Sequence, residues 1–299
     1  MPRSPTLPLL PALGALTNAT VWGVAWLPLK WLEAQGMPAL WTTLLVFGAC
    51  TGAVLAWRPG ALRRALGMPE LAWLTLASGL TNVCFNVALA TGDVVRCVLL
   101  FYLMPMWVVP LARWLLAEPV TLAALMRLAL ALCGAVLVLG RGEACIPWPS
   151  SLADGLAVAA GAAFALNNVL LRRLADAPHE ARSLAMFAGA VLLTPVGLGT
   201  MALVGTLPVL APAPWAWAGL AAFAALALLG NLALQYGAAR LRANTLSLLM
   251  LTEILVASLS SWLAGAAQLD AITLTGGALI VGASVLAVVM PGPAQPAKA

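Results

Sequence analysis

Ten long apolar stretches, separated by short polar or Gly- and Pro-containing segments, dominate the pattern of this chain. Most are about 20 residues long, the length that a helix rising 1.5 Å per residue needs to cross a hydrocarbon core of roughly 30 Å. Apolar and polar residues do not alternate along them, as they would in a transmembrane barrel. We therefore predict an all-α membrane protein with ten transmembrane helices. The predicted spans are 8–32, 38–57, 70–90, 94–116, 120–140, 152–174, 183–205, 215–237, 241–264 and 271–290.

The composition supports this class. Hydrophobic residues make up 63% of the chain and charged residues only 8%, with a mean hydropathy of +1.00. Soluble domains carry about 25% charged residues. The chain therefore lacks the polar residues that a water-facing shell requires.

The distribution of Lys and Arg predicts the orientation, because cytoplasmic loops keep the excess positive charge. Eleven basic residues fall on the side of the N-terminus, three fall on the other side, and Arg127 lies inside a span. We expect both termini in the cytoplasm of a bacterial-type cell, with the chain in the inner membrane. The net charge of +5 is thus a topology signal and gives no argument for a nucleic-acid partner. The first group is Arg3, Arg58, Arg63, Arg64, Arg113, Arg172, Arg173, Arg182, Arg240, Arg242 and Lys298, and the second is Lys30, Arg96 and Arg141.

An internal repeat relates the two parts of the chain. A shift of 148 residues lays Trp114 on Trp262 and Gly134 on Gly282. A shift of 149 residues lays Asn82 on Asn231 and Asn86 on the similar residue Gln235. This match carries more weight, because polar residues are costly in lipid and recur less often by chance. A looser match relates Trp22, Trp26 and Lys30 to Phe164, Asn168 and Arg172. We predict two five-helix halves, residues 1–145 and 146–299, which an odd number of spans makes inverted relative to each other.

Five segments together carry a family resemblance. They are WGVAWLPLKW (22–31), LLFYLMPMWVVPLARWLLAEPVT (99–121), LCGAVLVLG (132–140), LNNVLLRRL (166–174) and NTLSLLMLTEILVASLSSWLAG (244–265). These segments resemble the drug/metabolite transporter superfamily, specifically its ten-span bacterial exporters with two EamA-type repeats. The run GDVVRCVLLFYLMPMW (92–107) is similar to exporters of aromatic and other hydrophobic amino acids. The resemblance implies a central cavity lined mainly by spans 1, 3, 4, 6, 8 and 9.

The family often ends its fourth and ninth spans with Gly or Ala followed by Glu. Glu118 keeps this pattern, whereas Ala266 stands at the matching place in the second half. We therefore expect Glu118 to cap a helix end or loop.

Glu253 lies near the middle of the ninth predicted span, where a charged carboxylate costs about 2.5–3.5 kcal/mol on insertion scales. It is the first candidate for carrying a proton or pairing with a substrate ammonium group. The alternative is a neutral carboxyl group hydrogen-bonded to a neighbouring helix.

Arg96, at the outer start of the fourth span, is the second candidate, because its guanidinium can hold a carboxylate in two hydrogen bonds. Its alternative role is an i,i+3 ion pair with Asp93.

The remaining candidates are aromatic and amide side chains within spans. Trp22 and Trp26 continue a helical stripe from Asn18, which is expected either to line a cavity for a flat group or to pack against other helices. Trp107 also lies deep, whereas nine tryptophans near span ends, Trp73 and Trp114 among them, are expected at the membrane interfaces. Tyr102 and the amides need hydrogen-bond partners or a cavity, because lipid offers neither. The amide candidates are Asn82, Asn86, Asn168, Asn231 and Gln235, with Asn167 in the same polar set. We expect Asn82 and Asn86 to face Asn231 and Gln235 in the interior.

Glycines and prolines predict where helices approach or bend. Gly48 and Gly52 form a G-x-x-x-G motif, which permits close helix approach. Four prolines interrupt helical hydrogen bonding and are expected at bends, with plain packing as the alternative for each. These prolines are Pro28, Pro105, Pro110 and Pro195.

A secondary active transporter explains the repeat, the polar residues within spans and the short loops together. It implies a small-molecule substrate, the lipid bilayer as surroundings, and no cofactor or metal. The alternatives are a channel, a non-transporting packing subunit, or a drug exporter of the same family. An enzyme is disfavoured, because the one histidine, His179, is in a predicted loop and no Cys, His or acid cluster has metal-ligand spacing. No oligomeric state follows from the sequence.

Overall fold

The computed structural model describes residues 9–140, 149–266, 268 and 270–290. Helices connected by turns and short loops make up this part of the chain, which contains no strand. Ten of its helical segments are long and apolar enough to cross a membrane by length and composition, as predicted. The predicted boundary at residues 145 and 146, and the charges of Arg3, Arg141 and Lys298, lie outside the described residues.

Seven of the ten candidate spans are single helices. They are α3 (Ala39–Trp57), α5 (Leu71–Thr91), α8 (Leu122–Gly140), α9 (Leu152–Arg173), α10 (His179–Leu203), α11 (Ala216–Ala238) and α14 (Ala271–Val289). The other three spans are each divided in two, and a short helix, α4 (Ala61–Leu66), follows α3. The divided spans consist of α1 (Leu9–Val24) and α2 (Trp26–Ala34), α6 (Val94–Phe101) and α7 (Met104–Leu116), and α12 (Ala243–Met250) and α13 (Thr252–Leu263).

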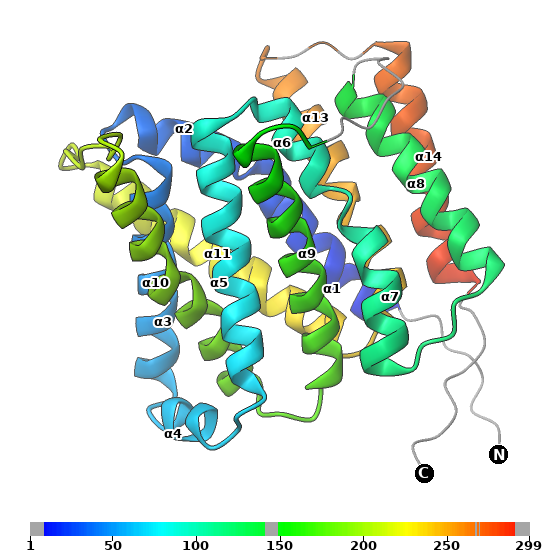
Figure 1. Cartoon of the computed structure of the whole chain (residues 1–299), viewed down its shortest axis with the longest axis horizontal. Coiled ribbons are helices and arrows are strands. Elements are labelled where there is room, and N and C mark those ends of the chain that lie inside the picture. The colour runs from blue at the N-terminus through cyan, green and yellow to red at the C-terminus, as the bar shows by residue number, and fades with distance from the viewer. Residues whose placement is uncertain (1–8, 141–148, 267, 269, 291–299) are drawn as a thin grey trace.

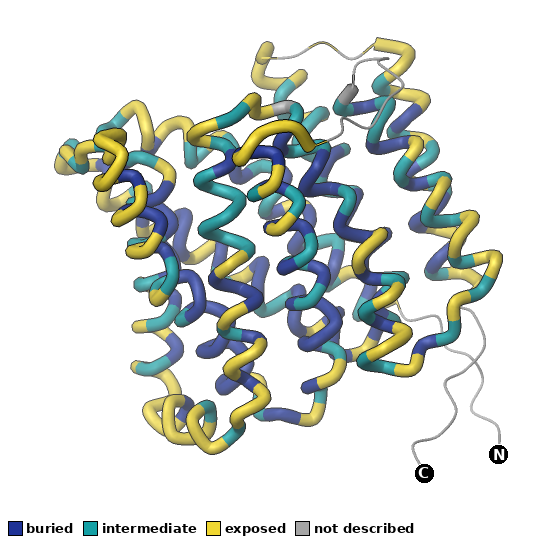
Figure 2. Tube along the Cα trace, viewed as in Figure 1, coloured by how far each residue is buried: buried dark blue, intermediate teal, exposed yellow. Residues whose placement is uncertain are grey.

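The helices form one bundle, in which α5 packs closely against α9 and α10, and α1 packs against α11 and α13 (Figure 1). Helices α8 and α14 stand side by side at one edge. Buried residues gather where helices face one another, and exposed residues cover the outer faces (Figure 2). The largest buried cluster includes Leu74 of α5, Met104 of α7, Leu171 of α9 and Leu234 of α11.

The closest helix contacts are made at glycines other than those predicted. A Cβ on Gly79 of α5 would lie 2.4 Å from the carbonyl oxygen of Gly189, and one on Gly189 would lie 2.1 Å from that of Thr75. By contrast, a Cβ on Gly48 or Gly52 would meet no atom of the described residues within 4 Å. The G-x-x-x-G motif therefore does not mediate close approach to any other helix that the structure describes.

We expect Gly79→Ala to destabilise the protein by about 1–3 kcal/mol, because the added methyl group overpacks the α5–α10 contact against backbone. Thermal unfolding of purified protein in detergent checks this as a melting temperature several degrees below that of the wild type. Gly52→Ala is the matched control and is expected to change the melting temperature little. Equal melting temperatures for the two variants would contradict the packing shown here.

Candidate functional site

The breaks in the fourth and ninth spans organise the candidate site. In the fourth span α6 ends at Phe101 and α7 begins at Met104, and in the ninth α12 ends at Met250 and α13 begins at Thr252. Pro105, in the first turn of α7, lacks the N–H that a continuous helix would use at the first break.

The break in the ninth span contains no proline. Side-chain hydroxyls donate to carbonyl groups in the last turn of α12, and Thr252 Oγ1 donates to the Leu249 carbonyl at 2.6 Å. Ser284 Oγ of α14 donates to the Leu248 carbonyl at 3.0 Å. Of the predicted bends, those near Pro28 and Pro105 match breaks, whereas Pro110 and Pro195 lie inside continuous helices.

Glu253 and Tyr102 meet between these two breaks. Glu253 lies in the first turn of α13, Tyr102 directly follows α6, and their side chains lie within hydrogen-bonding reach of each other. Tyr102 is buried and Glu253 half-buried. A Cβ on Gly23 of α1 would lie 2.9 Å from the Glu253 carbonyl oxygen, so α1 packs directly on this turn. The site thus joins spans 1, 4 and 9. Glu253 contacts a residue of another span, which also fits its alternative role as a carboxyl group hydrogen-bonded to a neighbouring helix.

An aromatic cluster surrounds the break in the fourth span. The ring of Phe101 lies 4.5 Å from that of Phe85 on α5, 5.4 Å from that of Tyr102 and 5.6 Å from that of Phe164 on α9, centroid to centroid. A Cβ on Gly161 of α9 would lie 2.6 Å from the Phe101 carbonyl oxygen, so α9 approaches the break closely. The carboxyl group of Glu253 and the phenol of Tyr102 therefore lie beside a largely aromatic wall.

The two predicted tryptophans of the first span have different surroundings. Trp22 stacks on Phe47 of α3 at 6.4 Å and meets Phe223 of α11 edge-on at 6.2 Å. Trp26 Nε1 donates to Ser260 Oγ of α13 at 2.9 Å. Trp22 is therefore part of the packing between helices, and Trp26 links the first span to the ninth.

Among the described residues, no hydrogen bond joins the two predicted amides of α5 to the two of α11. Asn82 Nδ2 donates to the Ser78 carbonyl, and Asn86 Nδ2 donates to the Asn82 carbonyl and to Thr43 Oγ1 of α3. On α11, Asn231 Nδ2 donates to the Ala227 carbonyl, and Gln235 pairs with Ser183 of α10. Each amide thus has a partner on its own helix or on the helix packed against it.

Three buried asparagines carry amide atoms without a hydrogen-bond partner among the described residues. Asn168 of α9 is fully buried, and neither its Oδ1 nor its Nδ2 is satisfied. Asn18 Nδ2 on α1 and Asn167 Oδ1 on α9 are in the same state. Buried amide groups usually find partners, so these atoms are candidates for binding a polar group during function.

Arg96 forms an ion pair across the two halves of the chain. Its Nε donates to Asp154 Oδ2 of α9 at 2.8 Å, and its guanidinium also donates to Ser150 Oγ at 3.0 Å. Asp93 caps α6 by accepting the Arg96 backbone N–H at 2.8 Å. Asp154 was not among the predicted site residues, although Ser151 and Asp154 before an apolar run have the spacing of a capping box.

Glu118 links the two halves at the other end of the fourth span. It is buried, and its Oε1 accepts the backbone N–H of Ala243 at the start of α12 at 3.1 Å. Burial raises the pKa of the Glu118 carboxyl group, and the N–H of Ala243 and the nearby Arg242 and Arg172 oppose this rise. The predicted capping role is present, but it serves α12 in the second half.

The raised pKa of Glu118 gives a pH dependence of stability. The folded chain keeps this proton at pH values where an unfolded carboxyl group has lost it, so stability falls as pH rises from the ordinary pKa of 4.5 through the folded value. We expect Glu118→Gln to lack this loss of stability with rising pH when melting temperatures are compared across pH 4 to 8. Glu70→Gln, at an exposed residue, should retain it. Parallel profiles for Glu118→Gln and the wild type would contradict this account.

Ten apolar spans around helix breaks that carry buried polar side chains are typical of a multi-pass membrane protein of the transporter class. Residues 9–140 match the model of the EamA-like transporter family. A crystal structure of a protein with 21% sequence identity matches the chain with a TM-score of 0.76, covering 94% of this chain and 96% of that chain. At this identity the likeness shows a shared fold alone. A comparison with curated proteins finds no match.

Proposed function

We propose that the protein is a secondary active transporter that exports amino acids, aromatic or other hydrophobic ones favoured, or related small metabolites by alternating access. The observation that carries this proposal is the meeting of two helix breaks at Tyr102 and Glu253. Transporters bind substrates near the membrane midplane between discontinuous helices of this kind. The carboxyl group of Glu253 suits a substrate ammonium group or a coupling proton, and the neighbouring rings of Phe85, Phe101 and Phe164 suit an apolar side chain.

The helix boundaries support two repeated halves. A shift of 149 residues lays α6 on α12 and α8 on α14, residue for residue at both ends of each helix. The two halves would therefore break their fourth and ninth spans at equivalent positions. With five spans in each half the second would be inverted, a plan that suits alternating access by rocking of one half against the other.

Two polar contacts between the halves are the candidate gates of this cycle. The Arg96–Asp154 ion pair lies at the start of the fourth span, and the Glu118–Ala243 hydrogen bond lies just beyond its end. A transporter must open one side while the other stays closed, so these contacts would break in alternation. The asymmetry of basic residues favours the cytoplasm of a bacterial-type cell for the Glu118 end, with the protein in its inner membrane.

Flux measurements test the proposal. Purified protein in liposomes is expected to exchange radiolabelled aromatic or other hydrophobic amino acids, with a rate that depends on an imposed proton gradient. A panel of small polar metabolites and a cationic drug tests the other substrates. Ion currents without saturable exchange would instead indicate a channel, and the absence of flux for every compound would favour a packing subunit.

A further inference from the structure

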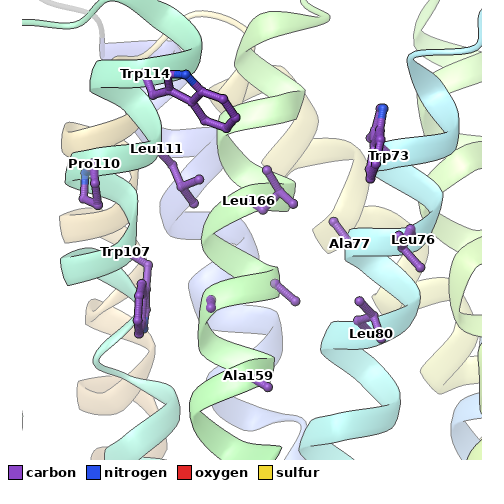
Figure 3. A pocket seen from close by; sticks show the side chains of 12 residues that line it. Trp73, Leu76, Ala77, Leu80, Trp107, Pro110, Leu111, Trp114, Ala159 and Leu166 are labelled. Atoms are coloured by element: carbon purple, nitrogen blue, oxygen red, sulfur yellow. The ribbon is translucent and has the colours of Figure 1, made fainter.

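A groove of about 660 Å³ runs along the outside of the bundle between α5, α7 and α9, on the first turns of α7 and beyond (Figure 3). Trp73, Leu76 and Leu80 of α5 form one wall, and Trp107, Leu111 and Trp114 of α7 form the other (Figure 3). Its floor is α9, which contributes small residues such as Ala159. Apart from the indole N–H groups, the lining side chains carry no polar atom.

The groove is exposed although it is apolar. Trp114 is 81% exposed and Trp73 62% exposed, and Trp107 and Ala159 are exposed as well. In a protein with ten candidate spans, this outer face meets the acyl chains of the bilayer. Its volume falls in the range of about 300–1,000 Å³ that small-molecule sites occupy. The shape and chemistry therefore fit an acyl chain held between two helices.

Positive charge gathers at the Trp73 and Trp114 end of the groove. Arg113 precedes Trp114 on α7, and Arg173 lies seven residues after Leu166 on the groove face of α9. Both arginines are exposed, and neither forms a hydrogen bond or an ion pair with another described residue. The acidic Glu70 precedes Trp73 by three residues at the same end, so a headgroup phosphate would lie toward α7 and α9.

We propose that this groove is a specific site for an anionic phospholipid, with one acyl chain between α5 and α7 and the headgroup phosphate held by Arg113 and Arg173. Tryptophans at this level match the interfacial depth that indole rings prefer. Arginine-lined pockets between spans are suited to anionic headgroups. The lipid would fill the gap between α5 and α7 over α9 and keep these helices in register.

Native mass spectrometry of the full chain in detergent, with added lipids, tests this site. Phosphatidylglycerol and phosphatidylcholine with identical acyl chains are the probes. We expect the wild type to retain one phosphatidylglycerol at several-fold higher occupancy than phosphatidylcholine. Ala159→Phe fills the groove and should lower this occupancy at least fivefold. Ala222→Phe, at an exposed alanine in the corresponding part of α11, is the matched control and should leave it unchanged.

Headgroup recognition is tested by Arg173→Gln, which should remove the preference for phosphatidylglycerol while Ala159→Phe removes the bound lipid itself. Unchanged lipid occupancy in Ala159→Phe would overturn the proposal. A dimer that Ala159→Phe dissociates would overturn it in favour of a second copy of the chain in the groove. If Ala159→Phe lost amino acid binding but kept its lipid occupancy, the proposal would be overturned in favour of a lateral substrate entrance.

Discussion

Glu253→Gln is expected to lower substrate flux in proteoliposomes by at least about tenfold, equivalent to ~1.4 kcal/mol in the limiting step. Gln keeps the shape of the side chain and its ability to hydrogen-bond Tyr102, but it cannot carry a proton or a negative charge. Glu253 lies in the first turn of α13, directly after the break in the ninth span, so this loss would act where α12, α13 and α1 meet. The measurement is the initial rate of uptake with and without a proton gradient, at matched protein content.

The variants around Glu253 separate its candidate roles. Glu253→Asp should retain part of the flux, because it keeps the carboxyl group. Tyr102→Phe should alter the pH dependence of flux more than the maximal rate, because it removes only the facing phenol. Glu33→Gln, at an exposed residue in the last turn of α2, is the control and should transport as the wild type does. A fully active Glu253→Gln with an unchanged pH profile would make Glu253 a purely structural link between spans 4 and 9.

The number and approximate ends of the spans follow from the sequence, because burying a backbone in lipid demands long uninterrupted apolar helices. The break in the ninth span does not follow, since no proline marks it. Its carbonyl groups accept additional hydrogen bonds from Thr252 nearby and from Ser284 of another span, and the second partner is visible only after folding. The break in the fourth span, by contrast, lies next to the predicted Pro105.

Side-chain partners across helices are the least predictable part of the site. Glu253, Tyr102 and Arg96 could be singled out as polar residues in apolar surroundings, but the pairing of Arg96 with Asp154 joins residues 58 positions apart. That Gly79, and not Gly48, lies at a close helix contact is equally hard to predict from the sequence. A helix that is apolar all round gives no signal in its sequence about which face meets a neighbour.

Breaking the Arg96–Asp154 ion pair is expected to lower both stability and flux. Asp154 is almost fully buried, whereas one third of the Arg96 side chain is exposed, so removing one partner should cost about 1–3 kcal/mol, below the cost of a fully buried pair. Arg96→Gln and Asp154→Asn each remove one charge, and Asn keeps an acceptor for the backbone N–H groups of Ser150 and Ser151. If the pair acts as a gate, each change should also reduce flux several-fold.

A double-mutant cycle decides whether the two charges act together. The double variant Arg96→Gln/Asp154→Asn should be no worse than the poorer single variant, in melting temperature and in initial flux, because the first substitution already breaks the pair. Arg96→Gln combined with Asp176→Asn, an exposed acid beyond α9, is the uncoupled control and should show additive effects. Additive losses in the Arg96–Asp154 pair would show two independent roles, with Asp154 capping α9 and Arg96 available to hold a substrate carboxylate. Non-additive stability with additive flux would keep the ion pair as a structural link and remove it as a gate.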